Sequence, residues 1–129
     1  MRIIPVDDIP AAWDVARPNI LKALDRSMGR WGERDILAAL VSSPEFWTLW
    51  LHENAALVTR LVGYPRMAVC EIVLAGGENL KSWAQYETLI CDYARSKGCQ
   101  QIEMYGREGW DRIKTEGWEK TGIRLTKDL

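Results

Sequence analysis

The sequence predicts one domain, residues 1–129, with an α/β fold of the α+β kind: a mixed central sheet of about six strands flanked by about four helices. Three observations predict this fold. Residues 67–118 run as apolar segment, helix, strand and short helix, an order that implies two parallel strands joined by a crossover helix. Residues 46–74 hold three strand-like segments separated by turn residues, which predicts an antiparallel meander. The chain has 129 residues, 47% of them hydrophobic, which is enough to fill a core of its own.

The N-terminal part predicts a strand and then helices. Residues 2–6 are a candidate first strand, which two aspartates end. A helix is expected to begin within residues 9–16, and Pro18 either kinks this helix or begins a second segment. Apolar residues at positions i, i+1, i+4 and i+5 predict another helix over residues 33–42, which the sequence Ser-Ser-Pro ends.

The middle of the chain predicts the meander. Residues 46–52 and 56–64 alternate in pattern, and the turn-prone pair Glu53-Asn54 joins them into a hairpin. A Tyr-Pro-Arg turn then leads into a strand at residues 67–74, whose two faces are both largely apolar. A strand that is covered on both sides suits a central position in the sheet. Ala75-Gly76-Gly77 is expected to break this strand.

The last third predicts the crossover and the end of the sheet. Asn79 is a candidate N-cap for the crossover helix, and Gly98 suits a left-handed residue at its end. Residues 101–105 predict the parallel strand, and a short helix should precede Gly117-Trp118. Residues 120–125 predict a final strand, through which a homodimer is expected to form.

Composition excludes several classes of function. The net charge of −1, from 17 basic and 18 acidic residues, argues against nucleic-acid binding. No apolar run reaches the roughly 18 residues of a membrane span. The three cysteines have no Cys-x-x-Cys spacing and are predicted to be buried thiols in a reducing compartment. His52 is the single histidine, which excludes a metal site built on several histidines. We therefore expect a cytoplasmic protein without a metal.

Two charged residues are candidates for chemistry. Glu71 lies in the middle of a mostly apolar strand, where burial would raise its pKa and suit it to act as a general base. Alternatively, this face of the strand is partly solvated, or Glu71 pairs with Arg60 across the hairpin. Arg107 is expected beside the C-terminal edge of the sheet, where open α/β sheets bind ligands. It either binds an anion there or fixes its own loop through an ion pair.

The predicted order of elements resembles the GNAT (N-acetyltransferase) superfamily over essentially the whole chain. This order is strand, two helices, three antiparallel strands, helix, strand, helix, strand. The segments LWL, YPR, LAGGENLKSW, YARSKGC and GREGW further resemble divergent GNAT-like proteins that phages and prophages encode. The resemblance implies a phage-encoded protein or one of a bacterial host.

The resemblance implies acetyl-CoA as the cofactor. In GNAT enzymes the fourth strand splays from the fifth to admit pantetheine, which here implies binding by the strand end Val73, Leu74, Ala75, Gly76 and Gly77. A glycine-rich Q/R-x-x-G-x-G/A loop then binds the pyrophosphate through backbone N–H groups at a helix N-terminus.

The same resemblance shows departures at that loop. The motif falls on residues 78–83, where Glu78 replaces the Gln or Arg and Lys81 and Trp83 replace the glycines. The Glu78 carboxylate would repel pyrophosphate and the Trp83 indole would fill its space, although Lys81 offers a charge to the phosphate. These replacements argue against acetyl-CoA binding.

The usual general acid of the superfamily is also replaced. It is a tyrosine four residues before a Gly-aromatic pair, and it protonates the departing thiolate. Here Gly117-Trp118 matches the pair, but Ile113 occupies the tyrosine position. Tyr105, at the end of its strand, is the candidate substitute.

These departures favour one function and leave a second open. The first is a phage-type GNAT-fold protein that has lost acetyl transfer and acts as a binding or assembly component with a protein partner, its cleft filled by Trp83. The second is an acyl-CoA-dependent N-acyltransferase that acetylates a small amine with Glu71 as base. A cavity between strands 67–74 and 101–105 would favour the second.

Overall fold

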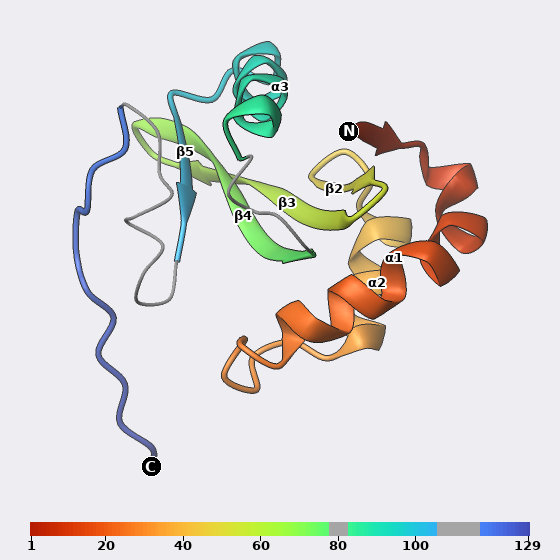
Figure 1. Cartoon of the computed structure of the whole chain (residues 1–129). Coiled ribbons are helices and arrows are strands. Elements are labelled where there is room, and N and C mark those ends of the chain that lie inside the picture. Colours follow the sequence, from red (N-terminus) through yellow and green to blue (C-terminus); the bar gives the residue numbers. More distant parts are fainter. Residues whose placement is uncertain (78–82, 106–116) are drawn as a thin grey trace.

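The chain folds into three layers, with one sheet between two layers of helices. The computed structural model describes residues 1–77, 83–105 and 117–129, and of residues 83–85 it describes the backbone only. In Figure 1, α3 lies over one face of the sheet, while α1 and α2 lie against the other. The described elements are β1 (Arg2–Ile4), a 3-10 turn η1 (Val6–Asp8), α1 (Ile9–Leu24), α2 (Glu33–Ser42), β2 (Trp47–His52), β3 (Ala55–Tyr64), β4 (Met67–Gly77), α3 (Trp83–Ser96) and β5 (Gln101–Met104).

The topology of the sheet confirms the predicted meander and crossover. The strand order is β1-β2-β3-β4-β5. Neighbouring strands from β1 to β4 pair antiparallel, whereas β4 and β5 pair in parallel. The crossover helix α3 connects the parallel pair, as a parallel connection requires. The chain is therefore a mixed α+β protein.

Two hydrophobic clusters hold the layers together, one on each face of the sheet. The cluster under α1 and α2 includes Ile9, Ile20, Ile36, Leu40, Leu49 and Val58. The cluster under α3 includes Trp50, Leu57, Cys70, Ile72, Tyr86 and Ile90. Because both faces of β3 and β4 are covered, their side chains are apolar on both sides, as the sequence predicted for the strand at 67–74.

The predicted break at Ala75-Gly76-Gly77 is wrong, because β4 continues to Gly77. Both glycines lie where another backbone segment comes very close. A Cβ on Gly76 would lie 2.0 Å from the Asn19 carbonyl oxygen of α1, and one on Gly77 would lie 2.1 Å from the Asn54 carbonyl oxygen. Gly77 also has φ +144°. The glycines therefore let α1 and the β2–β3 turn pack directly on β4.

Three details settle predictions about the helices. α1 continues from Ile9 to Leu24 with Pro18 inside it, so no second segment begins there. α2 has the predicted bounds. Gly98 ends α3 with φ +80°, and its N–H donates to the Arg95 carbonyl at 3.0 Å. That geometry confirms the predicted left-handed C-terminal residue.

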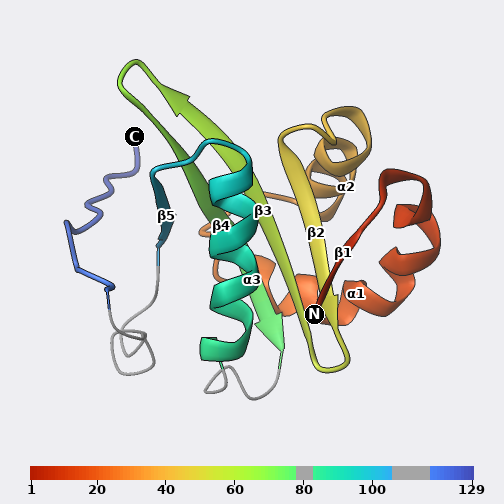
Figure 2. The same cartoon turned by 90° about the horizontal axis from the view of Figure 1, so that it is seen from above.

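The predicted final strand is wrong, so the described sheet has five strands where six were expected. Residues 118–129 form no strand, and Ile123 and Leu125 are 74% and 85% exposed. Alternation alone misled here, because this segment buries neither apolar residue against a neighbour. Figures 1 and 2 show it running outside β5. The described part has three α-helices, and the predicted fourth helix and the Asn79 N-cap fall outside the described residues.

No helix within the described ranges is long and apolar enough to cross a membrane.

Candidate active site

The pairing between the two parallel strands, β4 and β5, ends at Ile72. The last β4–β5 pair is Ile72 with Met104, whereas β4 continues from Val73 to Gly77 paired with β3 alone. The register between β3 and β4 also shifts here: Val58 lies opposite Leu74 and Thr59 opposite Ile72, so Val73 is an extra residue in β4. Such a bulge bends a strand locally. β4 therefore bends at the point where β5 ends.

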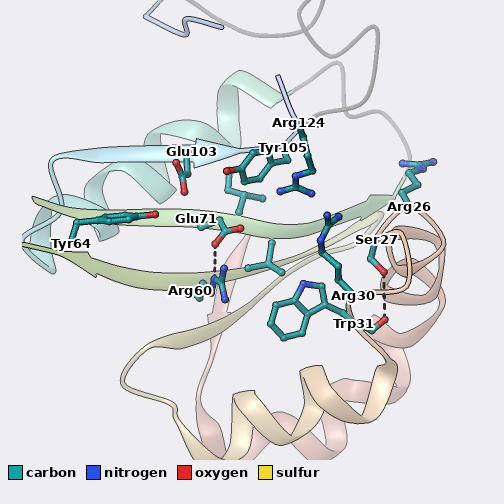
Figure 3. A pocket seen from close by; sticks show the side chains of 12 residues that line it. Arg26, Ser27, Arg30, Trp31, Arg60, Tyr64, Glu71, Glu103, Tyr105 and Arg124 are labelled. Atoms are coloured by element: carbon teal, nitrogen blue, oxygen red, sulfur yellow. Dashed lines mark hydrogen bonds and ion pairs between the residues drawn. The ribbon is translucent and has the colours of Figure 1, made fainter. Parts of the chain in front are cut away.

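A cavity of about 290 Å³ lies at this point, on the face of the sheet that α1 and α2 cover. We call it the charged cavity, and Figure 3 shows its lining. β4 and β5 both contribute to it, and so does the loop between α1 and α2, residues 25–32. Its lining residues are Arg26, Ser27, Arg30, Trp31, Arg60, Tyr64, Glu71, Ile72, Val73, Glu103, Tyr105 and Arg124.

Glu71 is a buried residue of the cavity lining and is paired. Its Oε2 accepts a hydrogen bond from Arg60 Nε at 2.5 Å, and the residue is only 8% exposed. The pair confirms the alternative prediction for Glu71. The Arg60 guanidinium in turn lies 5.6 Å from the Trp31 ring and 5.7 Å from the Trp47 ring. Two indoles and a carboxylate thus fix Arg60, and Arg60 neutralises Glu71.

Glu103 is the second carboxylate of the cavity and differs from Glu71. The parallel register places Glu103 opposite Glu71. Burial raises the pKa of Glu103, the Glu71 carboxylate raises it further, and Arg60 lowers it. Within the described ranges, Glu103 makes no hydrogen bond or ion pair. Its carboxylate is therefore more basic than an ordinary one and is available to a ligand.

Tyr105 lines the cavity one residue beyond β5. It is 64% exposed, and the Arg124 guanidinium lies 3.7 Å from its ring centroid. This contact attaches the C-terminal segment to the end of β5. The segment thereby brings a basic side chain to the cavity.

The α1–α2 loop carries two further arginines, Arg26 and Arg30, to the cavity. The chain leaves α1 through backbone hydrogen bonds, from Arg26 N–H to the Ala23 carbonyl at 3.1 Å and from Ser27 N–H to the Leu24 carbonyl at 2.9 Å. It then reverses at residues 28–29, which have φ 59° and 76°. The Ser27 hydroxyl donates to the Trp31 carbonyl at 3.5 Å, which closes the loop.

The structure brings three of the predicted site residues into the cavity lining: Glu71, Val73 and Tyr105. Leu74 packs into the core under α1 and α2, and Ala75 packs against the core under α3. Gly76 and Gly77 are in close contact with other backbone, as described above. Lys81, Arg107 and the Trp83 side chain lie outside the described residues. The assignment of a cofactor to these positions stays a prediction.

Sequence reasoning missed Glu103, Arg30 and Arg124. A usable signal existed for Glu103, because aligning the two parallel strands in register places it beside Glu71. Arg124 had a misleading signal, since the alternation around it predicted a strand. Nothing in the sequence marked Arg30, whose position depends on a loop with a non-glycine left-handed residue, Met28.

Thiol and metal chemistry find no support in the described residues. Cys70 is fully buried, and burial raises its pKa to about 12, so the thiol stays protonated. Cys91 and Cys99 are half-buried, and burial raises their pKa as well. No group of three or more His, Cys, Asp or Glu residues in the described ranges could hold a metal ion.

Comparisons of sequence find no relative, whereas comparisons of structure find many. No protein-family model and no curated protein matches the chain. Among solved structures, a GNAT-family acetyltransferase of Staphylococcus aureus is 12% identical with a TM-score of 0.62, covering 99% of this chain and 96% of that one. A predicted acetyltransferase of Clostridium acetobutylicum, solved with acetyl-CoA, is 14% identical with a TM-score of 0.63, covering 99% and 94%. An acetyltransferase of Trypanosoma brucei is 14% identical with a TM-score of 0.55, covering 99% and 97%.

These similarities extend over nearly the full length of both partners in each comparison. At such low identity they concern the fold and not the activity. Together with the strand order and the parting of β4 from β5, they show that the chain has the fold of the GNAT acetyltransferases.

Proposed function

We propose that the chain is an acyl-CoA-dependent N-acyltransferase that acetylates a small amine. The observation that carries this proposal is the charged cavity, where β4 and β5 separate and a basic, available carboxylate, Glu103, faces the space. From the sequence, a cavity between these two strands is the feature that favours a catalytic function over a purely binding one.

The described residues fit the pantetheine part of acetyl-CoA. From Val73 to Gly77, β4 pairs only with β3, so the opposite edge of its backbone is not used by β5. Such an edge can hydrogen-bond an extended ligand. Gly76 and Gly77 pack against backbone, so we assign them no contact with phosphate. Acetyl-CoA supplies an activated acyl thioester when bound, as it is in the Clostridium neighbour.

The residues of the cavity have separate tasks in the proposed reaction. The Glu103 carboxylate takes the proton from the acceptor amine, whose nitrogen then forms the C–N bond as the C–S bond of the thioester breaks. The Tyr105 hydroxyl gives a proton to the departing thiolate, and the second proton of the new amide nitrogen passes through solvent to the Tyr105 oxygen, which restores the hydroxyl. Arg60 pairs with the Glu71 carboxylate, and Glu71 raises the pKa of Glu103. We thus assign the base to Glu103 in place of Glu71.

The second candidate is the binding or assembly component, of phage type, that the sequence favoured. The Arg60–Glu71 pair supports it, because a carboxylate that is neutralised by its own protein makes a poor base. The replaced glycines of the pyrophosphate loop support it as well.

Titration calorimetry with acetyl-CoA, followed by thioester consumption with a panel of amines, tests the two candidates. We expect the wild-type protein to bind acetyl-CoA, and Glu103→Gln to bind it equally but to lose about 10²-fold or more in kcat. Glu45→Gln, an exposed residue away from the cavity, is the matched control and should retain full activity.

Failure to bind acetyl-CoA, with binding gained by Trp83→Gly, would support the second candidate, because the indole would then close the cleft. Full activity of Glu103→Gln would contradict the assignment of the base.

A further inference from the structure

Acidic and basic side chains lie in different parts of the charged cavity. The two carboxylates, Glu71 and Glu103, face each other across β4 and β5. Figure 3 shows the guanidinium groups of Arg30 and Arg124 directed toward the opposite part of the cavity, next to the Tyr105 ring. A ligand that fills the space therefore meets negative charge at one end and positive charge at the other.

The arginines at the basic end have no acidic partner among the described residues. Ion pairs in those ranges engage Arg17, Arg60 and Arg95 only. Arg30 Nη1 contacts the Met28 sulfur at 3.6 Å, and Arg124 stacks on Tyr105.

A stacked guanidinium keeps the N–H groups of its edge free to bind a carboxylate in two-point fashion. Arg26 lines the same cavity and adds to the positive charge. The basic end is thus suited to an anion.

The size of the cavity limits the ligand. About 290 Å³ is at the lower end of the range for small-molecule sites, which is roughly 300 to 1,000 Å³. A compact molecule fits such a space, and a folded protein surface does not. The two ends of the cavity also lie within one small volume, so one compact ligand can contact both.

We propose that the acceptor is a small amino acid, recognised as a zwitterion. Its carboxylate binds Arg30 and Arg124, and its amine lies at Glu103. This inference rests on the proposed function and names the substrate class of the same site. It assigns the specificity to the α1–α2 loop and the C-terminal segment, neither of which takes part in the proton transfers.

The test measures binding without acetyl-CoA, so that it does not depend on activity. Titration calorimetry compares three matched sets of ligands: free amino acids, their carboxamides, and the carboxylic acids that lack the amine. We expect at least one amino acid to bind about tenfold or more tightly than both of its analogues, because each analogue leaves one end of the cavity unmatched.

Variants then locate the two ends. Arg30→Gln and Arg124→Gln should each lose the preference for the acid over the amide, while Arg34→Gln, an exposed arginine of α2, should keep it. Arg124 lies in a segment outside the sheet and helices, so Arg124→Gln still reports if Arg30→Gln fails to fold.

Three results would overturn the inference: amides that bind as tightly as acids, a preference that both arginine variants retain, or no binding by any member of the three sets. The proposed function is tested separately. If the protein acetylates amines without a carboxylate, and this activity depends on Glu103, the proposed function holds and the inference about amino acids fails.

Discussion

The two faces of the sheet differ in the charge of the polar groups that they cover. Under α3 the polar groups are neutral and paired: Trp50 Nε1 donates to Thr59 Oγ1 at 3.0 Å, and the Thr48 and Tyr93 hydroxyls are 2.9 Å apart. Neutral groups that are paired in this way add to stability or cost nothing.

On the opposite face, near β5, the polar groups are charged: Glu71 is buried and Glu103 is half-buried. Glu71 has a partner in Arg60, whereas Glu103 has none among the described residues. A charge that is partly removed from water and has no partner costs some stability. If the proposed function holds, substitutions of the charged groups near β5 should change activity more than stability, and substitutions under α3 should change stability more than activity.

The largest loss of stability should come from truncating a fully buried core residue, such as Ile90 under α3. Ile90 is fully buried, and Ile90→Ala should lower the free energy of unfolding by about 2 to 5 kcal/mol, because it leaves a cavity in the core. Urea denaturation measures this change. Leu89→Ala, the neighbouring residue at 43% exposure, is the matched control and should cost much less. Equal costs for the two variants would contradict the assigned packing of α3.

A smaller loss should follow when the buried ion pair is broken. Arg60→Met should lower the free energy of unfolding by about 2 kcal/mol, since it leaves the Glu71 carboxylate buried without its partner. The half-exposed position of Arg60 keeps this cost below that of a fully buried pair. The double variant Arg60→Met with Glu71→Leu should recover most of the loss in the same urea experiment. If the double variant is less stable than the single one, the pair is not what holds Glu71.

The paired hydroxyls under α3 should contribute less again. Tyr93→Phe removes the contact with Thr48 and should cost about 1 kcal/mol, while the edge-to-face contact of the ring with Trp50 remains. Thermal unfolding with Tyr64→Phe, an exposed tyrosine, as the control measures the difference. An unchanged affinity for acetyl-CoA in Tyr93→Phe would be consistent with a purely structural α3 face.

The fold was more predictable than the site for a physical reason. Alternation and helical spacing report which face of an element is buried, so β2, β3 and α2 were predicted almost to the residue. The residues 75–77 were misread, because glycine indicates a turn and close backbone contact equally well. The Arg60–Glu71 pair was foreseen as an alternative, since the hairpin register alone places the two residues opposite each other.

The site depends on contacts between segments distant in sequence. Glu103 becomes basic through burial and through Glu71 on the adjacent strand, and neither effect is local. Arg124 reaches Tyr105 from a segment without regular structure. Aligning the two parallel strands could have placed Glu103 beside Glu71, whereas the contact of Arg124 with Tyr105 leaves no periodic trace in the sequence and could not be predicted from it.

The smallest expected effect is a gain in the free energy of unfolding, for Glu103→Gln, where the substitutions above cause losses. Because burial and Glu71 raise the pKa of Glu103 in the folded chain, the folded state binds that proton more tightly than the unfolded state does. This contribution to stability is fully present below the ordinary pKa of 4.5 and is lost as pH rises through the higher folded value. Above that value Glu103→Gln should be more stable than the wild type, by less than about 1 kcal/mol given the partial exposure of the group.

Urea denaturation at a series of pH values measures this difference, and the exposed Glu45→Gln should show none. The assignment of Glu103 as unpaired would be contradicted by either of two results. One is a stability difference between Glu103→Gln and the wild type that does not shrink below pH 4.5, and the other is a Glu103→Gln variant that is less stable than the wild type at neutral pH. A variant that gains stability and loses activity identifies a residue that is kept for function at the expense of the fold. Ile90→Ala should lose stability and keep its activity, because Ile90 packs in the cluster under α3 and does not line the charged cavity.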